Sequence, residues 1–441
     1  MRKKVWRKAV IGSLGLALVS SGLLAAPKAF AGPDMKQTLK VVYSSEAAFD
    51  KDYGNAFSKK YPLTEFEVIA PDYGKLDYDK LIAKHSPDLV MLDPYNYRQM
   101  AEGKKLKDLE PLMERDDYDT AALYPGLIDE LKKQGGGELY GLSKSVQTNA
   151  LFYNADLFEK YNVEPPKDGM TWEEVLKLAR KFPTAGDKDS RIWGLSSFGS
   201  ANLAMQIART EGLSPIDPET LKVTSNTPAW KKAYDISIGA TKSGVLDEKI
   251  SLSAKNYLQS SPFVMGRSAM VVSSVTELKN LQAAKSSVKN YKPFTLGIAA
   301  GPADSEGRNS TGDFYTSDIF AVPAQASNVE GAWDFIEYVT GEEYAEAYYS
   351  AKTPDNINLL SRMVDEYAGY EADAFYRLKP NLDPYLKAHS VSLKSFALEA
   401  NFWSILEQEL KLAASNKKTA DQAAAAVQSQ AQAAADRLTK R

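Results

Sequence analysis

Three short apolar runs, separated by two helix-like segments, open the chain. Residues 39–43 (LKVVY), 66–69 (FEVI) and 87–93 (PDLVMLD) have the length and character of strands. Between them, residues 53–60 and 78–84 carry apolar side chains at helical spacing. Strands that alternate with helices in this way form a parallel sheet with right-handed crossovers. This rhythm predicts an α/β fold.

The loops after the first and third predicted strands are the parts of this sheet best placed to meet a ligand. In open α/β sheets, ligands bind outside the carboxyl ends of the strands. Here those ends lead into residues 43–50 and 93–97, which we expect to be polar loops. They are candidates for one wall of a ligand site.

The chain has 441 residues, which exceeds one ordinary hydrophobic core, so we expect two lobes. Its hydrophobic content of 44% and charged content of 25% are typical of a globular protein. The C-terminal third has helical character, with an amphipathic helix that opens at residues 401–403. Residues 418–437 are rich in Ala and Gln and are predicted to form the closing helix.

Residues 1–31 have the pattern of a secretory signal peptide. Basic residues crowd the first eight positions, an apolar stretch covers residues 9–26, and Ala29-Phe30-Ala31 is a small-x-small cleavage site. The alternative is an uncleaved anchor helix. Cleavage after about Ala31 removes six basic residues and leaves 48 basic against 57 acidic residues. This balance argues against nucleic acid and anionic membrane surfaces as partners.

The chain contains no cysteine and only two histidines, His85 and His389. These counts exclude thiol chemistry, cysteine-ligated metals and His-rich metal sites. No GxSxG nucleophile motif and no Walker phosphate-binding loop is present. We therefore expect no cofactor, no metal and no catalytic residues. A glycosidase that uses two carboxylates stays open as an alternative, because the chain has 57 acidic residues.

The stretch QTNALFYNADLFEK, residues 147–160, combines a buried strand with a helix. Residues 150–153 are apolar, and Asn154 and Asp156 supply turn and helix-cap chemistry. Its sequence resembles the signature motif of the family 1 extracellular solute-binding proteins, the receptors that deliver sugars to ABC importers. FVMGRSAMVV (residues 263–272) and EGAWDFIEYV (residues 330–339) are similar to two further segments of that family.

The resemblance extends from about residue 39 to the C-terminus and implies the fold. It implies a two-lobed periplasmic-binding-protein-like architecture, each lobe a mostly parallel sheet flanked by helices, with three crossings between the lobes. We expect a signal peptide at residues 1–31, a first lobe from 35–148 plus 316–355, and a second lobe from 149–315 plus 356–441.

The resemblance also implies where a ligand would bind. Sugars are held by aromatic faces, which stack on the ring, and by carboxylates and amides, which take the hydroxyls. The implied positions come from the first-lobe loops, the crossings, the GRSAM loop and the C-terminal helix: Tyr43, Glu46, Asp93, Tyr95, Gln147, Asn149, Ser274, Asp313, Phe314, Tyr315 and Trp403.

Five of these positions have a structural alternative. The alternatives are a cap of the following turn for Asp93, strand core for Tyr43, a hinge hydrogen bond for Gln147, a hinge spacer for Tyr315 and interhelical packing for Trp403.

By resemblance, the chain is a monomeric binding protein and not an enzyme. It would capture a carbohydrate, an oligosaccharide, between its lobes and deliver it to the membrane permease of an ABC importer. It would act outside the cell or in the cell envelope, without the lipid-bearing N-terminal cysteine that many such receptors carry. The alternatives are a secreted polysaccharide-degrading enzyme and a sugar sensor coupled to a signalling receptor.

Overall fold

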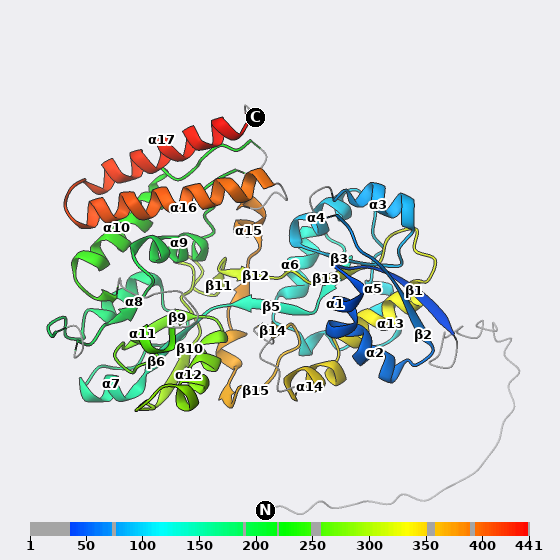
Figure 1. Cartoon of the computed structure of the whole chain (residues 1–441), viewed down its shortest axis with the longest axis horizontal. Helices are drawn as coiled ribbons and strands as arrows, with labels where there is room; N and C mark the ends of the chain where they lie inside the picture. Colours follow the sequence, from blue (N-terminus) through cyan, green and yellow to red (C-terminus); the bar gives the residue numbers. More distant parts are fainter. Residues whose placement is uncertain are drawn as a thin grey trace, which may run out of the picture.

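The computed structural model describes residues 36–72, 76–187, 191–217, 220–247, 257–350, 358–388 and 393–439. They form two lobes, each built round its own five-stranded sheet, with a small sheet between them (Figure 1). The predicted two-lobed α/β architecture is confirmed. The predicted signal peptide lies outside the described residues.

The first lobe is built on a sheet with the strand order β2-β1-β3-β13-β4. The first three strands in the chain are parallel, as the opening rhythm predicts. β13 is antiparallel to both of its neighbours, so the sheet is mixed and not mostly parallel. β4 leaves this lobe towards the crossing and β13 returns from it, so the two strands run in opposite directions. The strands are β1 (Gln37–Val42), β2 (Thr64–Ile69), β3 (Leu89–Leu92), β4 (Gly141–Ser143) and β13 (Ile319–Ala321).

Helices surround this first sheet (Figure 1). The expected polar loops over residues 43–50 and 93–97 are wrong, because helices begin inside them at Glu46 and Pro94. Ser45 caps the first of these helices by accepting a hydrogen bond from the Ala48 amide at 3.2 Å. The segments are α1 (Glu46–Phe49), a π-helical turn η1 (Asp50–Gly54), α2 (Asn55–Lys60), α3 (Tyr78–His85), α4 (Pro94–Glu102), α5 (Glu110–Arg115), the 3₁₀ turn η3 (Thr120–Ala122), α6 (Leu127–Gln134), α13 (Val329–Val339) and α14 (Glu342–Ser350).

The core of the first lobe is rich in aromatic side chains from distant parts of the chain. Phe335 of α13 lies with its ring centroid 5.7 Å from that of Phe49, 5.3 Å from that of Phe57 and 5.3 Å from that of Phe320. All four side chains are fully buried. Aromatic pairs at these distances add stability beyond the area they bury, so α13 is fixed onto the sheet.

The second lobe is built on a sheet with the order β10-β6-β9-β7-β8, which is also mixed. β6 is antiparallel to β9 and β10, whereas β7 is parallel to β8 and β9. The predicted strand and helix of residues 147–160 are confirmed: Asn154 ends β6 and caps α7 by accepting from the Leu157 amide at 3.2 Å. The strands are β6 (Ala150–Asn154), β7 (Leu195–Ser196), β8 (Leu246–Asp247), β9 (Met270–Ser273) and β10 (Leu296–Ala299).

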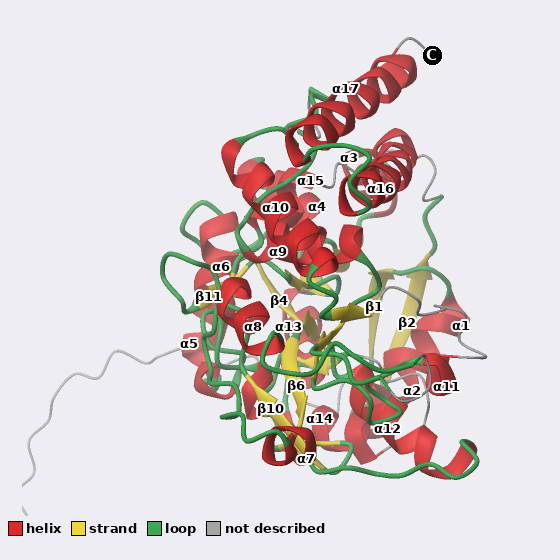
Figure 2. Cartoon of the chain, turned by 90° about the vertical axis from the view of Figure 1, so that its left-hand side faces the viewer, coloured by secondary structure: helices red, strands yellow, loops and turns green. Residues whose placement is uncertain are grey.

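Two long C-terminal helices, α16 and α17, lie side by side at one end of the second lobe (Figures 1 and 2). α17 confirms the predicted closing helix. α16 begins at Leu393, so the prediction that a helix opens at residues 401–403 is wrong, and these residues lie within it. The second-lobe helices are α7 (Ala155–Lys160), α8 (Trp172–Ala179), α9 (Ser200–Thr210), α10 (Pro228–Lys242), α11 (Tyr257–Ser260), α12 (Thr276–Ser287), α15 (Asp383–Ala388), α16 (Leu393–Ala414) and α17 (Ala420–Thr439).

A three-stranded antiparallel sheet, β12-β5-β14, lies between the two larger sheets (Figure 1). Three separate segments of the chain therefore meet in the region between the lobes. The strands are β5 (Ser145–Thr148), β12 (Phe314–Tyr315) and β14 (Leu359–Leu360); the remaining short elements are β11 (Ser310–Thr311), β15 (Glu366–Tyr367), β16 (Tyr370–Glu371), the 3₁₀ turn η4 (Asp373–Phe375) and β17 (Lys379–Pro380).

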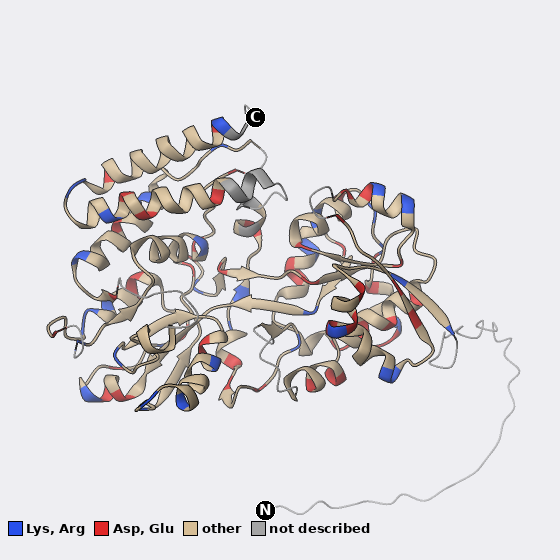
Figure 3. Cartoon of the chain, in the orientation of Figure 1, with Lys and Arg blue, Asp and Glu red and all other residues tan. Residues whose placement is uncertain are grey.

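Acidic and basic residues are interspersed over both lobes (Figure 3). Within the described ranges, no helix has both the length and the apolar character needed to cross a bilayer. In the same ranges, no group of three or more His, Asp or Glu side chains could hold a metal ion.

Candidate functional site

A cavity of about 640 Å³ lies where the small central sheet meets the second lobe. The end of β5 and the β12 segment form one side, and helices α9 and α16 form another. Seven of the eleven nominated residues line it. The lining residues are Gln147, Thr148, Asn149, Met205, Arg209, Leu213, Pro215, Ser274, Gly312, Asp313, Phe314, Tyr315, Pro384, Glu399, Phe402 and Trp403.

Asp313 is the centre of a cluster of polar side chains in this cavity, which we call the polar group; its other members are Asn149 and Arg209. One of its carboxylate oxygens accepts a hydrogen bond from the Asn149 side-chain amide at 2.6 Å. The other lies 3.7 Å from a terminal guanidinium nitrogen of Arg209, in the last turn of α9. A cation is favourable there because the carbonyl end of a helix carries partial negative charge.

Gly312 explains how Asp313 comes so close to α9. A Cβ atom at this position would collide with the backbone carbonyl oxygen of Arg209 and would overlap the ring of Pro384. Only glycine lets the two backbones approach this closely. The local sequence Thr311-Gly312-Asp313 therefore fixes the carboxylate beside the guanidinium, and the Thr311 hydroxyl accepts a hydrogen bond from the Asp313 amide at 3.1 Å.

Trp403 supplies an aromatic face to the cavity. Its side chain is partly buried and packs against the cluster formed by α9, α10, α16 and α17. The neighbouring Phe402 is buried, with its ring centroid 6.2 Å from that of Trp230 in an edge-to-face arrangement. Phe402 and Trp403 therefore pack between helices and also line the cavity.

Gln147 and Ser274 lie between the main cavity and a second hollow of about 160 Å³. The Gln147 side-chain amide donates to the side-chain oxygen of Asn358 at 2.9 Å. The Ser274 hydroxyl donates to Thr276 Oγ1 at 3.1 Å and accepts from the Thr276 amide at 3.3 Å. Gln147 thus makes the kind of hydrogen bond between crossing segments that its structural alternative describes.

Phe314 and Tyr315 form β12 and pair with Thr148 and Gln147 of β5. Phe314 is buried, and its ring centroid lies 5.3 Å from that of Tyr124 in the first lobe. This aromatic contact joins the central sheet to the first lobe.

The four nominated first-lobe residues do not line the cavity. The Asp93 carboxylate caps α4, accepting from the amides of Tyr95 and Asn96 at 2.9 and 3.0 Å. Tyr95 accepts a hydrogen bond from the Gln99 side chain at 2.7 Å. Glu46 is exposed in the first turn of α1. For Asp93 the structure shows the cap that the sequence leaves open as an alternative.

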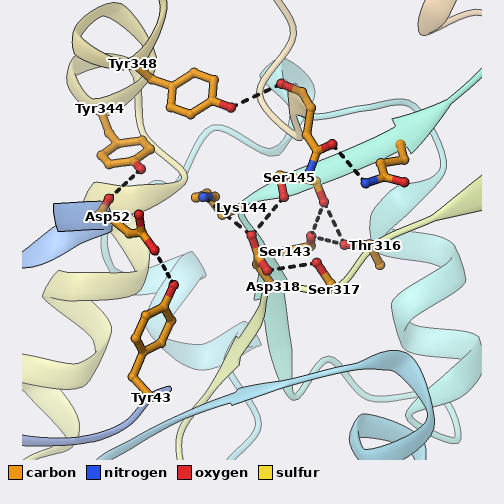
Figure 4. A network of polar contacts seen from close by, with 12 residues as sticks. Tyr43, Asp52, Ser143, Lys144, Ser145, Thr316, Ser317, Asp318, Tyr344 and Tyr348 are labelled. Carbon is orange, nitrogen blue, oxygen red and sulfur yellow. Dashed lines mark hydrogen bonds and ion pairs between the residues drawn. The ribbon is translucent and has the colours of Figure 1, made fainter. Parts of the chain in front are cut away.

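Tyr43 is buried against Phe49 and Tyr53, and its hydroxyl donates to the Asp52 carboxylate at 2.7 Å (Figure 4). Burial, together with the nearby Asp52 and Asp318 carboxylates, raises the pKa of its hydroxyl well above its ordinary value. Tyr43 is therefore a core residue of the first lobe, as its structural alternative to ligand binding describes.

A polar network holds the start of β5 against the first lobe (Figure 4). The nearly buried Lys144 ammonium lies 3.4 Å from the Asp318 carboxylate and 4.7 Å from the ring centroid of Tyr53. The Ser145 hydroxyl donates to the same carboxylate at 3.0 Å. The backbone oxygen of Ser145 in turn accepts from the Thr316 hydroxyl at 2.7 Å. The outgoing and returning crossings are therefore tied together next to the cavity.

Arg209, Met205 and Glu399 line the cavity but carry no recognisable sequence signal. All three lie on helices, α9 and α16, whose periodicity predicts a helix but not the face that meets a distant loop. Gly312 beside Asp313 indicates that two backbones approach closely at this point. It does not reveal that the neighbour is Arg209.

Comparison with known proteins identifies the family. The family model described as bacterial extracellular solute-binding protein matches residues 41–346. An uncharacterised ABC transporter extracellular-binding protein of Pyrococcus horikoshii is 22% identical over 417 residues, covering 81% of this chain and 96% of that protein.

The arabinooligosaccharide-binding protein of Bacillus subtilis is 25% identical over 174 residues, which cover 38% of this chain and 39% of that protein. The crystal structure of a sugar transporter from Rhizobium etli, in an open conformation, has a TM-score of 0.61 at 19% identity, with 90% of this chain and 99% of that chain covered. This structural likeness shows the shared fold. The chain belongs to the bacterial extracellular solute-binding proteins.

Proposed function

We propose that this chain captures a carbohydrate, an oligosaccharide, in the cavity beside its central sheet and delivers it to the permease of an ABC importer. The observation that carries the proposal is the pairing, in one cavity, of the Trp403 face with the Asn149–Asp313–Arg209 polar group. Aromatic faces stack on the apolar faces of sugar rings, while amides, carboxylates and guanidinium groups bind hydroxyls. The printed name of the Bacillus subtilis relative supports the same ligand class.

The size of the cavity fits a ligand larger than a single small solute. Its 640 Å³ falls within the range of about 300–1,000 Å³ found for sites that bury most of a drug-sized molecule. The adjoining hollow of 160 Å³ shares Gln147, Thr148 and Ser274 with it. A chain of sugar units could thus extend across β5.

The proposal is binding and not catalysis. The Asp313 carboxylate already accepts from Asn149 and faces Arg209, an arrangement that presents hydroxyl-binding groups in fixed positions. Glycosidases place two carboxyl groups on either side of the scissile bond, one of which must donate a proton. Incubation with polysaccharides that releases no new reducing ends is the expected result, and new reducing ends would contradict the proposal.

The family and the sequence also support a proposal for the cellular setting. We propose that residues 1–31 direct export and are removed, and that the mature chain works as a monomer outside the cytoplasm without a lipidated cysteine. We also propose lobe boundaries at 35–148 plus 316–355 and at 149–315 plus 356–441. Deletion of the protein should abolish uptake of its saccharide, and unchanged uptake would instead favour a sensor.

A thermal-shift screen tests the proposal directly. Arabinotriose, maltotriose, xylotriose and cellotriose are added to the purified protein, and a ligand at 100 times its Kd should stabilise the folded state by about 2.7 kcal/mol. Trp403→Ala should lose the shift from the best saccharide, whereas Tyr95→Ala, an aromatic residue of similar exposure outside the cavity, should keep it. An undiminished shift in Trp403→Ala would remove Trp403 from the site.

A further inference from the structure

The cavity contains a balanced charge pair. Arg209 is the one Lys or Arg side chain among the described residues that line it, and it faces the Asp313 carboxylate at 3.7 Å. Glu399 adds a second carboxylate to the wall. The described lining therefore carries no surplus of positive charge with which to attract an anion.

The pair is arranged to bind neutral hydroxyl groups. A distance of 3.7 Å is too long for a direct hydrogen bond between the guanidinium and the carboxylate. A sugar with two neighbouring hydroxyls can donate one hydrogen bond to the carboxylate of Asp313 and accept another from the guanidinium of Arg209. The Asn149 amide, at 2.6 Å, and the Thr311 hydroxyl, at 3.1 Å from the Asp313 amide, hold the carboxylate in place for this contact.

The same pair disfavours a charged ligand. The Arg209 side chain is about half exposed, and the Asp313 side chain is only 12% exposed. A phosphate or carboxylate bound to Arg209 would come within a few ångströms of a poorly hydrated like charge. Repulsion at such a distance weakens binding by at least about tenfold.

We propose that this cavity selects an uncharged, hydroxyl-rich saccharide and rejects its phosphorylated or carboxylated counterparts, and that Asp313 beside Arg209 makes this discrimination. The inference rests on the proposed carbohydrate function and narrows its substrate class. The Asp313 carboxylate repels anions. Arg209 binds a hydroxyl group but attracts no anion, because the nearby carboxylate balances its charge.

Calorimetric titration of the full chain tests the inference. The neutral probes are maltotriose, arabinotriose, galactobiose and glucose, and the acidic probes are glucose 6-phosphate and digalacturonate. We expect at least one neutral probe to bind and both acidic probes to bind at least about tenfold more weakly. Tighter binding of an acidic probe would overturn the inference but leave a carbohydrate receptor in place. Failure of every probe to bind would overturn the inference and the proposed function together.

Two variants change the charge balance in opposite directions. Asp313→Asn keeps the shape of the side chain and removes the carboxylate that faces Arg209, so the preference for neutral over acidic probes should fall by at least about tenfold. Arg209→Met leaves Asp313 unmatched, so that preference should rise even as neutral binding weakens. A folding defect cannot produce opposite changes in one ratio.

Glu173→Gln, which removes an exposed carboxylate paired with Lys232 outside the cavity, is the matched control and should leave the ratio unchanged. An unchanged ratio in Asp313→Asn would contradict the inference.

Discussion

At the scale of single residues, Asp93 shows how one side chain can suit two roles. Its carboxylate accepts hydrogen bonds from two backbone amides of α4 and from the Asn96 side chain at 2.6 Å. Replacing a capping Asp by Ala costs about 1 kcal/mol. Asp93→Ala should therefore lower the free energy of unfolding in urea by about that amount and leave saccharide affinity unchanged. Lost affinity in a folded Asp93→Ala variant would return this residue to the ligand site.

Asp334 makes the stability of the folded state depend on pH. Burial, followed by the neighbouring Glu337 and Glu330 carboxylates, raises the pKa of Asp334 from its usual 3.8 to about 6. The folded state thus binds this proton more tightly than the unfolded state, and stability is lost as pH rises from about 4 to about 6.

Asp334→Asn should therefore raise the free energy of unfolding above pH 6, by about 1 kcal/mol after allowing for solvent screening of a partly exposed group. The same substitution should have little effect at pH 4. Urea unfolding of both proteins at pH 4 and pH 7 measures the difference. An equal effect at the two pH values would contradict this account of Asp334.

The sequence predicts some residues of the candidate site better than others. The family resemblance implies Asn149 and Asp313 as ligand-binding positions, and the structure brings their side chains together. Asp93 could not be assigned, because an Asp after a strand serves equally well as a cap or as a ligand contact. Arg209 could not be found, since its place depends on Gly312 approaching a helix more than a hundred residues earlier.

At the scale of elements, a buried charge couples the two C-terminal helices. Glu409 of α16 is 2% exposed, forms an ion pair with Lys418 and accepts from the Gln430 side chain of α17 at 2.8 Å. Removing one partner of a buried pair leaves an uncompensated charge, which is strongly destabilising.

Lys418→Met should therefore lower the free energy of unfolding by about 3 kcal/mol, measured in urea. Because the second substitution removes the uncompensated charge, the double variant Lys418→Met with Glu409→Gln should recover much of that loss. A single variant as stable as the original chain would show that Gln430 alone satisfies the carboxylate.

Helices and strands that are marked by neighbouring residues can be predicted from the sequence. The strands with which they pair are harder to predict. The parallel strands β1, β2 and β3 and the cap at Asn154 follow from neighbouring residues. The mixed character of the two sheets does not, because β13 in the first and β6 in the second pair antiparallel with strands far away in the sequence. The Ser45 cap is local, but α1 is only four residues long, and so short a helix gives little periodic signal.

At the scale of the whole molecule, the cavity is lined mainly from one side. Gln147 and Thr148, at the end of the first-lobe segment, line it, and its other lining residues in the described ranges belong to the second-lobe segments; the nominated residues Tyr43, Glu46, Asp93 and Tyr95 lie elsewhere. A ligand held in this cavity would gain further first-lobe contacts if the lobes approached each other. Because binding favours the state with more contacts, the ligand should shift the population towards a closed form.

Small-angle X-ray scattering of the full-length protein, with and without the saccharide that gives the largest thermal shift, tests this claim most directly. Closure of the two lobes should reduce the radius of gyration at saturating saccharide, and Trp403→Ala at the same concentration should show a smaller reduction. An unchanged radius of gyration in a protein that calorimetry shows to be fully bound would contradict capture by lobe closure.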